Sequence, residues 1–480
     1  MLYIQGKDRG QLSIMPMCLD DYVDADNICR VIEAFVLNLD MFELGFTHSY
    51  EKATGRPSFN PANMLMLYIY GYMNRVRSSR RLEAETKRNI EVMWLMQGLE
   101  PDDKTICNFR KDNAVALKKV FREFSIWCNK QGLYGKKLVA VDGTKTRANT
   151  SRKNIHSKNI TEKKLALVEK KINEFMSELD KNDITEYAEP QVSKEAVKES
   201  LKQLNERKLT LEECLDLIEK SEDGVISTVD PDARIMRQGG DGRSLDACYN
   251  VQTISDEKHK LIVDFEVSTL ADDKGALPQM TESAKEIMGV DEIAVVADKG
   301  YYDAEDIAEC EANNTKCFIP KVKHRNAAPD EKYNREFFKY DKENDCYICP
   351  DGVPLYCKNA DSKTDKKYNN FDACAKCENL EKCTKNQNGR QLIRTSNREI
   401  LDVIDDRMKT DQAVEIFRER KKIIEHPFGT TKKIWGFNQF LCRTKVKTTG
   451  EQSLVFLAYN LRRVINIFKE NGKNLLEVMA

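Results

Sequence analysis

The run KKLVAVDG, residues 136–143, is the feature that most limits how this chain can fold. Four consecutive apolar residues, 138–141, lead directly into Asp142 and Gly143. A short continuous apolar run bounded by polar residues is typical of a strand that is buried in a sheet. We therefore expect a buried strand here, whose end presents the Asp142 carboxylate on a rigid support.

Strand and helix patterns alternate after this run. Apolar spacing predicts a strand hairpin over residues 246–254 and 260–269, joined by the polar turn SDEKH, and a helix over 276–289. A strand over 292–298 follows and ends at Asp298, with a further helix and a strand after it. This order of elements is that of an α+β or α/β fold with an RNase H-like mixed sheet flanked by helices.

Residues 161–222, between the first strand and the hairpin, are highly charged and show helical spacing on both sides of the polar segment NDITEYAEPQVS. Two helices joined by a polar turn form a helical hairpin, so we expect an excursion from the sheet over residues 155–225. A plain spacer or a dimerising coiled coil is the simpler interpretation of the same pattern.

Residues 1–130 predict helices and carry a local excess of positive charge. Although the net charge of the chain is −1, residues 51–153 hold 21 Lys plus Arg against 10 Asp plus Glu. Short helices with basic residues near one turn suit a helix-turn-helix-like DNA reader, and a plain helical bundle with a solvated basic face is the alternative. The basic residues in question are Arg75, Arg77, Arg80, Arg81, Lys87 and Arg88.

The composition is that of a soluble protein, with 41% hydrophobic and 32% charged residues. We find no apolar run near the roughly 18 residues that a membrane span needs and no signal-peptide pattern, so we expect a cytoplasmic protein with no membrane partner. The 15 cysteines then belong to a reducing compartment, where they stay as thiols or bind metal.

The segment RKKIIEHPFGTTKK, residues 420–433, places five Lys or Arg around a single carboxylate, Glu425. In an RNase H-like fold, a late helix carrying Glu425 packs beside the strand ends that carry Asp142 and Asp298. Three carboxylates that approach one another repel, and hard divalent cations such as Mg²⁺ or Mn²⁺ relieve that repulsion. Two such ions promote in-line displacement at phosphorus. The rival acids of the same type are Asp230, Asp232, Asp272 and Asp273.

Several longer segments follow one another in a fixed order. They are GRPSFNPANMLMLYIYGYMNRVRSSRRLE, PDDKTICNFRK, VDGTKTRAN, DPDAR, YNVQT, VVADKGYYD, EHPFGTTKKIWGF and LAYNLRR. Together they resemble bacterial insertion-sequence transposases of the DDE class, in the branch with a helical N-terminal domain and an RNase H-like catalytic domain. The resemblance implies that Asp142, Asp298 and Glu425 are the catalytic, metal-binding acids.

The resemblance also implies basic residues on either side of the Glu that hold the phosphate of the element's end. Lys421 lies four residues before Glu425 and Lys432 lies seven after it, at same-face helical spacing, and Arg420 competes with Lys421 for the first position. Pro427 breaks or kinks a helix, which weakens the placement of Lys432.

Six cysteines lie within residues 346–383, in CYICPDGVPLYC and CAKCENLEKC. Paired CxxC steps suit a tetrahedral structural zinc ion, and reduced thiols in a small insertion are the alternative. Spacing alone favours Cys346 with Cys349, whereas the resemblance implies a different set. That set is Cys349, Cys374, Cys377 and Cys383.

We therefore expect a DNA transposase that binds the terminal inverted repeats of its own element, cuts the ends by metal-dependent hydrolysis and joins the 3′-hydroxyl to target DNA. Both ends must be brought together, so a homodimer or higher synaptic complex is expected. The predicted division is a DNA-binding domain over 1–130 and a catalytic domain over 131–480, with the hairpin and a cysteine-rich insertion over 325–400 inside it. The alternatives are an inactive descendant that only binds DNA and a nuclease without joining activity.

Overall fold

The computed structural model describes residues 18–49, 57–184, 194–221, 224–238, 244–321, 328–358, 365–395, 397–473 and 475–479. The predicted turn between the two hairpin helices falls mostly on 185–193 and lies outside the described residues. None of the helices in the described part of the chain is long and apolar enough to span a membrane.

The N-terminal region is helical, as its sequence pattern predicts. Its central helix α2 is buried along its whole length, begins at Pro61 and is capped by the Asn60 side chain, which accepts a hydrogen bond from the Ala62 backbone N–H at 2.8 Å. The elements are η1 (Leu19–Tyr22), α1 (Ile28–Leu37), α2 (Pro61–Met73), α3 (Ser79–Thr86), α4 (Ile90–Leu95), α5 (Asp103–Asp112) and α6 (Ala114–Lys130). Helices α1, α4 and α5 pack against α2.

A mixed sheet follows, which confirms the predicted change from a helical region to a mixed α/β region. Within the described residues its strand order is β4-β5-β1-β7-β8, with β6 pairing with β5. β1 is antiparallel to β5 and parallel to β7, and β7 is parallel to β8. The strands are β1 (Leu138–Arg147), β4 (Arg234–Gln238), β5 (Ser244–Asp256), β6 (Ile262–Ser268), β7 (Ile293–Val296) and β8 (Thr315–Phe318).

The prediction that the first strand ends at Asp142 is wrong, because β1 continues to Arg147. Its pairing with β7 stops at Ala140, but its pairing with β5 runs on to Arg147 opposite Cys248. Polar residues can occupy this second half of the strand because it has lost one of its two neighbours. Asp142 therefore lies at the position where β1 loses its parallel partner.

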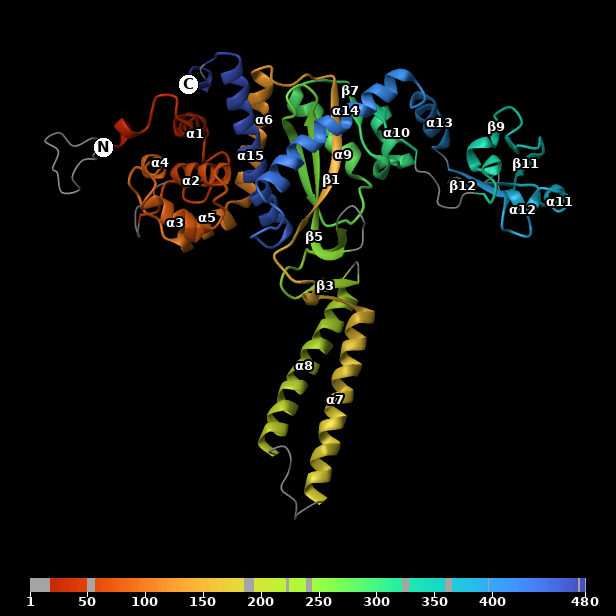
Figure 1. Ribbon diagram of the computed structural model, residues 1–480, viewed down its shortest axis with the longest axis horizontal. Coiled ribbons are helices and arrows are strands. Elements are labelled where there is room, and N and C mark those ends of the chain that lie inside the picture. The colour runs from red at the N-terminus through yellow and green to blue at the C-terminus, as the bar shows by residue number, and fades with distance from the viewer. Residues whose placement is uncertain are drawn as a thin grey trace, which may run out of the picture.

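Helices cover the sheet and two parts of the chain extend from it (Figure 1). Two long helices, α7 (Lys158–Ile184) and α8 (Lys194–Lys220), lie in the region of the predicted hairpin, project away from the body and are joined at their base by the short strands β2 (Ile155–Ser157) and β3 (Val225–Ser227). The helices around the sheet are η3 (Lys299–Tyr301), α9 (Ala276–Met288), α10 (Ala304–Ala312), α13 (Arg398–Arg407), α14 (Asp411–Phe428), η6 (Gly429–Ile434) and α15 (Lys445–Glu470). The last helix, α16 (Leu475–Met479), packs on α1.

The cysteine-rich region forms a separate small sheet, at the end of the molecule opposite the N-terminal helices (Figure 1). Its own core is small and includes Tyr333, Tyr347, Leu355 and Tyr368. The sequence pattern did not predict its strands. The elements are η4 (Glu331–Tyr333), η5 (Arg335–Phe337), β9 (Lys339–Asp341), β10 (Cys346–Ile348), β11 (Pro354–Cys357), β12 (Asp365–Asn369), α11 (Phe371–Cys374), α12 (Leu380–Cys383) and β13 (Gln391–Thr395).

A single hydrophobic core runs from the N-terminal helices into the main sheet, and α15 lies at its centre. Glu451 of α15 is fully buried, and one of its carboxylate oxygens accepts hydrogen bonds from the backbone N–H groups of Leu441 and Cys442, each at 2.8 Å. Its other oxygen accepts from the Tyr72 hydroxyl of α2 at 3.3 Å. The packing is therefore continuous across residue 130, and a domain boundary there stays a prediction.

Candidate active site and cysteine cluster

Asp142 and Asp298 are brought together by the register of two parallel strands. The last aligned pair of β1 and β7 is Ala140 with Val296, and each aspartate follows that pair by two residues. Both side chains thus lie at the same edge of the sheet, on strands that run about 4.8 Å apart. Asp298 also caps η3 by accepting a hydrogen bond from the Gly300 N–H at 2.7 Å.

The environment of Asp142 disfavours its charged form. Burial raises the pKa of Asp142 to about 6, the guanidinium of Arg420 opposes that rise, and the nearby Asp298 and Asp273 add to it. Arg420 Nη1 lies 3.3 Å from the Asp142 carboxylate, with both side chains largely buried. Arg420 thus neutralises an acid that would otherwise be buried among like charges.

Asp273 is a third carboxylate at this edge, and the sequence offered it only as a rival to the chosen acids. It lies in the turn between β6 and α9, and its Oδ1 accepts hydrogen bonds from Asn250 Nδ2 at 2.9 Å and Gln252 Nε2 at 2.7 Å. Those amides belong to β5, directly opposite Lys145 and Gly143 of β1. The sequence signal for Asp273 was the acidic turn LADDKG, which cannot distinguish it from Asp272.

The rivals Asp230 and Asp232 have structural partners instead. Asp230 is fully buried and accepts hydrogen bonds from the Tyr249 hydroxyl at 2.6 Å and the Thr444 N–H at 2.9 Å. Asp232 accepts from the Lys445 N–H at 2.6 Å. Both therefore hold the start of α15.

Glu425 lies on α14, which packs beside β1, but the structure does not bring its side chain to the aspartates. The side chain is 64% exposed and forms an ion pair with Lys421 at 3.8 Å, one turn earlier on the same helix. The α14 side chain that reaches the site is Arg420. Of the two candidates for the basic position before Glu425, Arg420 therefore faces the acids, while Lys421 is 75% exposed.

Lys432 and Glu425 lie in different surroundings, contrary to their predicted same-face spacing. Pro427 is accommodated inside α14, and the following residues, 429–434, form a π-helix, which has more residues per turn than an α-helix. Lys432 consequently points back to β1, where its Nζ donates to the Lys145 carbonyl at 2.6 Å. Burial lowers the pKa of Lys432 to about 8.

Lys432→Met is expected to increase the free energy of unfolding at pH 7 by up to about 3 kcal/mol, since 1.4 kcal/mol corresponds to one pKa unit. Below pH 8 the Lys432 amine is charged in both the folded and the unfolded chain, so the wild-type protein bears the full free-energy cost of burying that charge. Between pH 8 and 10.5 the Lys432 amine is neutral in the folded chain but still charged in the unfolded chain, so the stability that the variant gains over the wild type should decrease as the pH rises. Urea denaturation in chelator-containing buffer at pH 7 and 9.5 measures both values. Lys433→Met, at the exposed neighbour, is the control, and a gain that does not change with pH would contradict the prediction.

The predicted DNA-contacting arginines of the N-terminal helices have different surroundings. Arg75 and Arg81 are exposed. Arg80 and Arg88 form surface ion pairs with Asp103 at 3.3 Å and Glu85 at 2.5 Å. Arg77 instead donates to the Gln439 carbonyl at 3.1 Å and stacks over the Phe437 ring, so it links the N-terminal helices to the segment after η6.

The oxygen-rich edge fits a hard divalent cation by the chemistry of its side chains. Asp142, Asp298 and Asp273 supply carboxylates, and the amide oxygen of buried Asn250 beside them has no hydrogen-bond partner. Within the described regions, no three His, Cys, Asp or Glu side chains are spaced as finished ligands of an ion. The side chains at this edge are therefore of the kind that bind a divalent cation. In this structure, the guanidinium of Arg420 supplies the positive charge beside Asp142.

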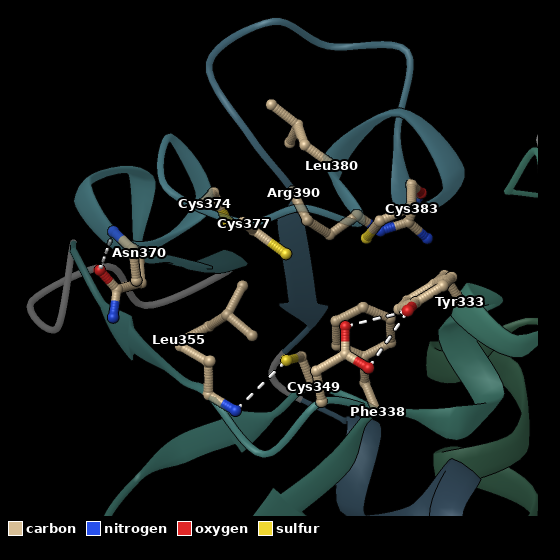
Figure 2. A pocket seen from close by; sticks show the side chains of 13 residues that line it. Tyr333, Phe338, Cys349, Leu355, Asn370, Cys374, Cys377, Leu380, Cys383 and Arg390 are labelled. Carbon is tan, nitrogen blue, oxygen red and sulfur yellow. Dashed lines mark hydrogen bonds between the residues drawn. The ribbon is translucent and has the colours of Figure 1, made fainter.

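Four cysteines surround a cavity of about 40 Å³ in the small sheet: Cys349, Cys374, Cys377 and Cys383 (Figure 2). Cys349 lies in a tight turn, where its sulfur accepts a hydrogen bond from the Val353 N–H at 3.3 Å. A side chain on Gly389 would collide with Cys374, because its Cβ would lie 2.5 Å from the Cys374 Cβ. Burial raises the pKa of Cys383 to about 11, and the other three thiols add to that rise.

The same four thiols are the set that the family resemblance favours. Cys346, the alternative from spacing, is buried in β10 and does not line the cavity. Four thiols around a small cavity, one of which accepts a hydrogen bond from a backbone N–H, are the type of ligand that structural zinc takes. Among the described residues, their sulfur atoms are not close enough together to ligate one ion.

Two family models match the chain. Residues 17–112 match the model described as Transposase domain (DUF772), and residues 348–465 match the model described as Transposase DDE domain. The first range covers most of the N-terminal helices, and the second covers much of the cysteine-rich region, all of α14 and most of α15. No curated protein and no solved structure matches the chain. Asp142 and Asp298 lie outside both matched ranges.

Proposed function

Since the chain is a DDE transposase of the insertion-sequence type, we propose that it binds the terminal repeats of its own element, cuts the DNA at the element's ends and joins the freed 3′-hydroxyl to target DNA. The observation that carries this proposal is the register of β1 and β7, which sets Asp142 and Asp298 side by side at one edge of the main sheet. The strand order and the covering helices support an RNase H-like catalytic domain over 131–480.

The acids of this edge would hold the divalent ions. Asp142 and Asp298 offer oxygen ligands from rigid positions. Glu425 would add a third oxygen ligand if its side chain left the ion pair with Lys421 and turned toward the two aspartates. Bound Mg²⁺ or Mn²⁺ supplies Lewis-acid activation of the attacking oxygen and stabilises the leaving one. Arg420 would then be released from Asp142 and become available to a DNA phosphate.

The DNA would reach this edge along basic side chains. The exposed Arg75 and Arg81 on the N-terminal helices and the exposed Lys421 beside Glu425 would contact phosphates, since solvent reaches all three side chains. Lys432 would act indirectly, through the β1 backbone that it holds. Arg77 would fix the N-terminal helices relative to the acids.

Two ends must be held at once, so we expect the active species to be a homodimer or a higher synaptic complex. The projecting hairpin of α7 and α8 is the candidate interface, because its length places it away from the body of the chain (Figure 1). In the cysteine-rich region, the four thiols would bind one structural zinc ion, because that region has only a small core of its own.

The test is an assay on a duplex that carries the element's terminal repeat. The purified chain should nick or cut the repeat's end with Mg²⁺ or Mn²⁺, should do nothing with a chelator, and should join pre-cut ends to a target plasmid. Binding without metal-dependent cleavage would favour the inactive DNA-binding alternative. Cleavage without joining would favour the nuclease alternative.

A further inference from the structure

Polar side-chain atoms approach the backbone of Gly143, next to Asp142, very closely. A Cβ at residue 143 would lie 2.6 Å from Asp273 Oδ1, 2.8 Å from Gln252 Nε2 and 3.0 Å from Asn250 Oδ1. These polar atoms can lie this close to β1 because residue 143 has no side chain. Asn250 is 1% exposed, and its Oδ1, which lies beside Gly143 and Asp273, accepts no hydrogen bond. A buried acceptor without a donor is costly, and a cation is one of the few partners that can satisfy it.

Gly300, two residues after Asp298, lies beside the second carboxylate oxygen of Asp273, Oδ2. A Cβ at residue 300 would lie 2.9 Å from Asp298 Oδ1 and 3.1 Å from Asp273 Oδ2, so both carboxylate oxygens face the same point. No hydrogen bond to Asp273 Oδ2 occurs in the described part of the chain, whereas Oδ1 accepts two. One oxygen of Asp273 thus accepts the two hydrogen bonds that fix the side chain, and the other lies beside Gly300, as does Asp298 Oδ1.

The fixing of Asp273 extends to the residue after Gly300. The Tyr301 hydroxyl donates to Gln252 Oε1, and Gln252 in turn donates to Asp273. Tyr301, Gln252 and Asn250 are all buried. The carboxylate is therefore held by a buried network that joins β5 to the segment carrying Asp298, which is how side chains are oriented when they must present an oxygen at a fixed place.

We propose that Asp273 is a further metal-binding carboxylate of this active site, which shares an ion with Asp298 and is assisted by the amide oxygen of Asn250. The inference rests on the proposed function, because it adds Asp273 to the three proposed catalytic acids Asp142, Asp298 and Glu425. A purely structural role would explain the two hydrogen bonds to Asp273 Oδ1, but it leaves the buried Asn250 Oδ1 without a partner.

Asp273→Asn tests the proposal with little change of shape, since the amide oxygen can still accept from Asn250 and Gln252. Titration calorimetry of the full chain with Mn²⁺ should show at least a tenfold loss of affinity, on the order expected when a ligand or its partner is removed. The Mn²⁺ concentration for half-maximal cleavage should rise by the same factor, with partial recovery at high Mn²⁺. Asp272→Asn removes an exposed carboxylate from the adjacent residue and should change neither value.

Gly300→Ala is a second variant that removes no carboxylate. Its methyl group would lie 2.9 Å from Asp298 Oδ1 and 3.1 Å from Asp273 Oδ2 and would displace both carboxylates, so Mn²⁺ affinity should fall although every acid is intact. Unchanged Mn²⁺ affinity in Asp273→Asn and Gly300→Ala, with the wild-type chain binding normally, would overturn the inference while leaving the proposed function in place. A wild-type chain that neither binds Mn²⁺ nor cuts DNA would instead overturn the proposed function.

Discussion

Asp298→Asn should lower the rate of metal-dependent cleavage by about a thousandfold or more while leaving binding to the element's ends unchanged. The substitution keeps the hydrogen bond to Gly300, because an amide oxygen can accept it, so η3 should stay in place. What is lost is a negative oxygen at the edge where β7 ends. Single-turnover cleavage of a labelled end duplex, with binding measured by fluorescence anisotropy in Ca²⁺, separates the two effects.

The matched control is Asp291→Asn, which removes the same charge from an exposed position before β7. It should cleave at the wild-type rate. Retained cleavage by Asp298→Asn would contradict the assignment of the acid. Glu425→Gln belongs in the same assay: a loss as large as that of Asp298→Asn would mean that the Glu425 side chain leaves Lys421 during the reaction.

The second large effect is expected in the cysteine-rich region. Replacing Cys377 by Ser should remove the bound zinc and unfold the cysteine-rich region, because metal binding can supply about 10 kcal/mol or more to a small domain and the core cluster among the described residues there has only eight buried members. Metal analysis of the purified chain should give one zinc per wild-type chain and none in the variant. Limited proteolysis should then cut the variant within this region first.

Cys346→Ser distinguishes the two sets of ligands that the sequence permits. Cys346 does not line the cavity, so this variant should keep its zinc and its resistance to proteolysis. Zinc lost from Cys346→Ser and kept in Cys377→Ser would contradict the proposed set. No zinc in the wild-type chain would mean that the thiols stay reduced and free.

That Asp142 and Asp298 lie close together could be predicted from the sequence, because each follows an apolar run that is typical of a buried strand. The run that contains Val139–Val141 and the run that ends at Asp298 both have the signature of buried parallel strands, and the order of the elements makes them neighbours. The helical hairpin was accessible for the same reason, since long amphipathic segments on both sides of a polar turn have few alternatives.

The relation between Glu425 and Lys432 could not be predicted, because it depends on a local change of helix type. A spacing of seven residues places two side chains on one face only if every turn has 3.6 residues. After Pro427 the π-helix breaks that rule and turns Lys432 toward β1. The sequence contained the warning, the proline, but not the direction of the change.

Asp273 could not be chosen over its rivals from the sequence, because its role depends on residues far along the chain. Asn250 and Gln252 lie more than 20 positions before it, and the pleat of β5 points both amides to the same face. Strand periodicity predicts that the two amides share a face. Which acid they meet is decided by the fold of the turn after β6.

The shared core around Glu451 has a consequence for how a DNA end is measured. A reader joined by a flexible linker could dock at variable distances from the cutting site, and the position of the cut would then vary. Here Tyr72, Arg77 and α15 join the N-terminal helices firmly to the segment that follows Glu425. If the proposed function holds, the N-terminal helices stay at a fixed distance from the cutting site. The packing of α15 then sets the number of base pairs between the recognised repeat and the scissile phosphate.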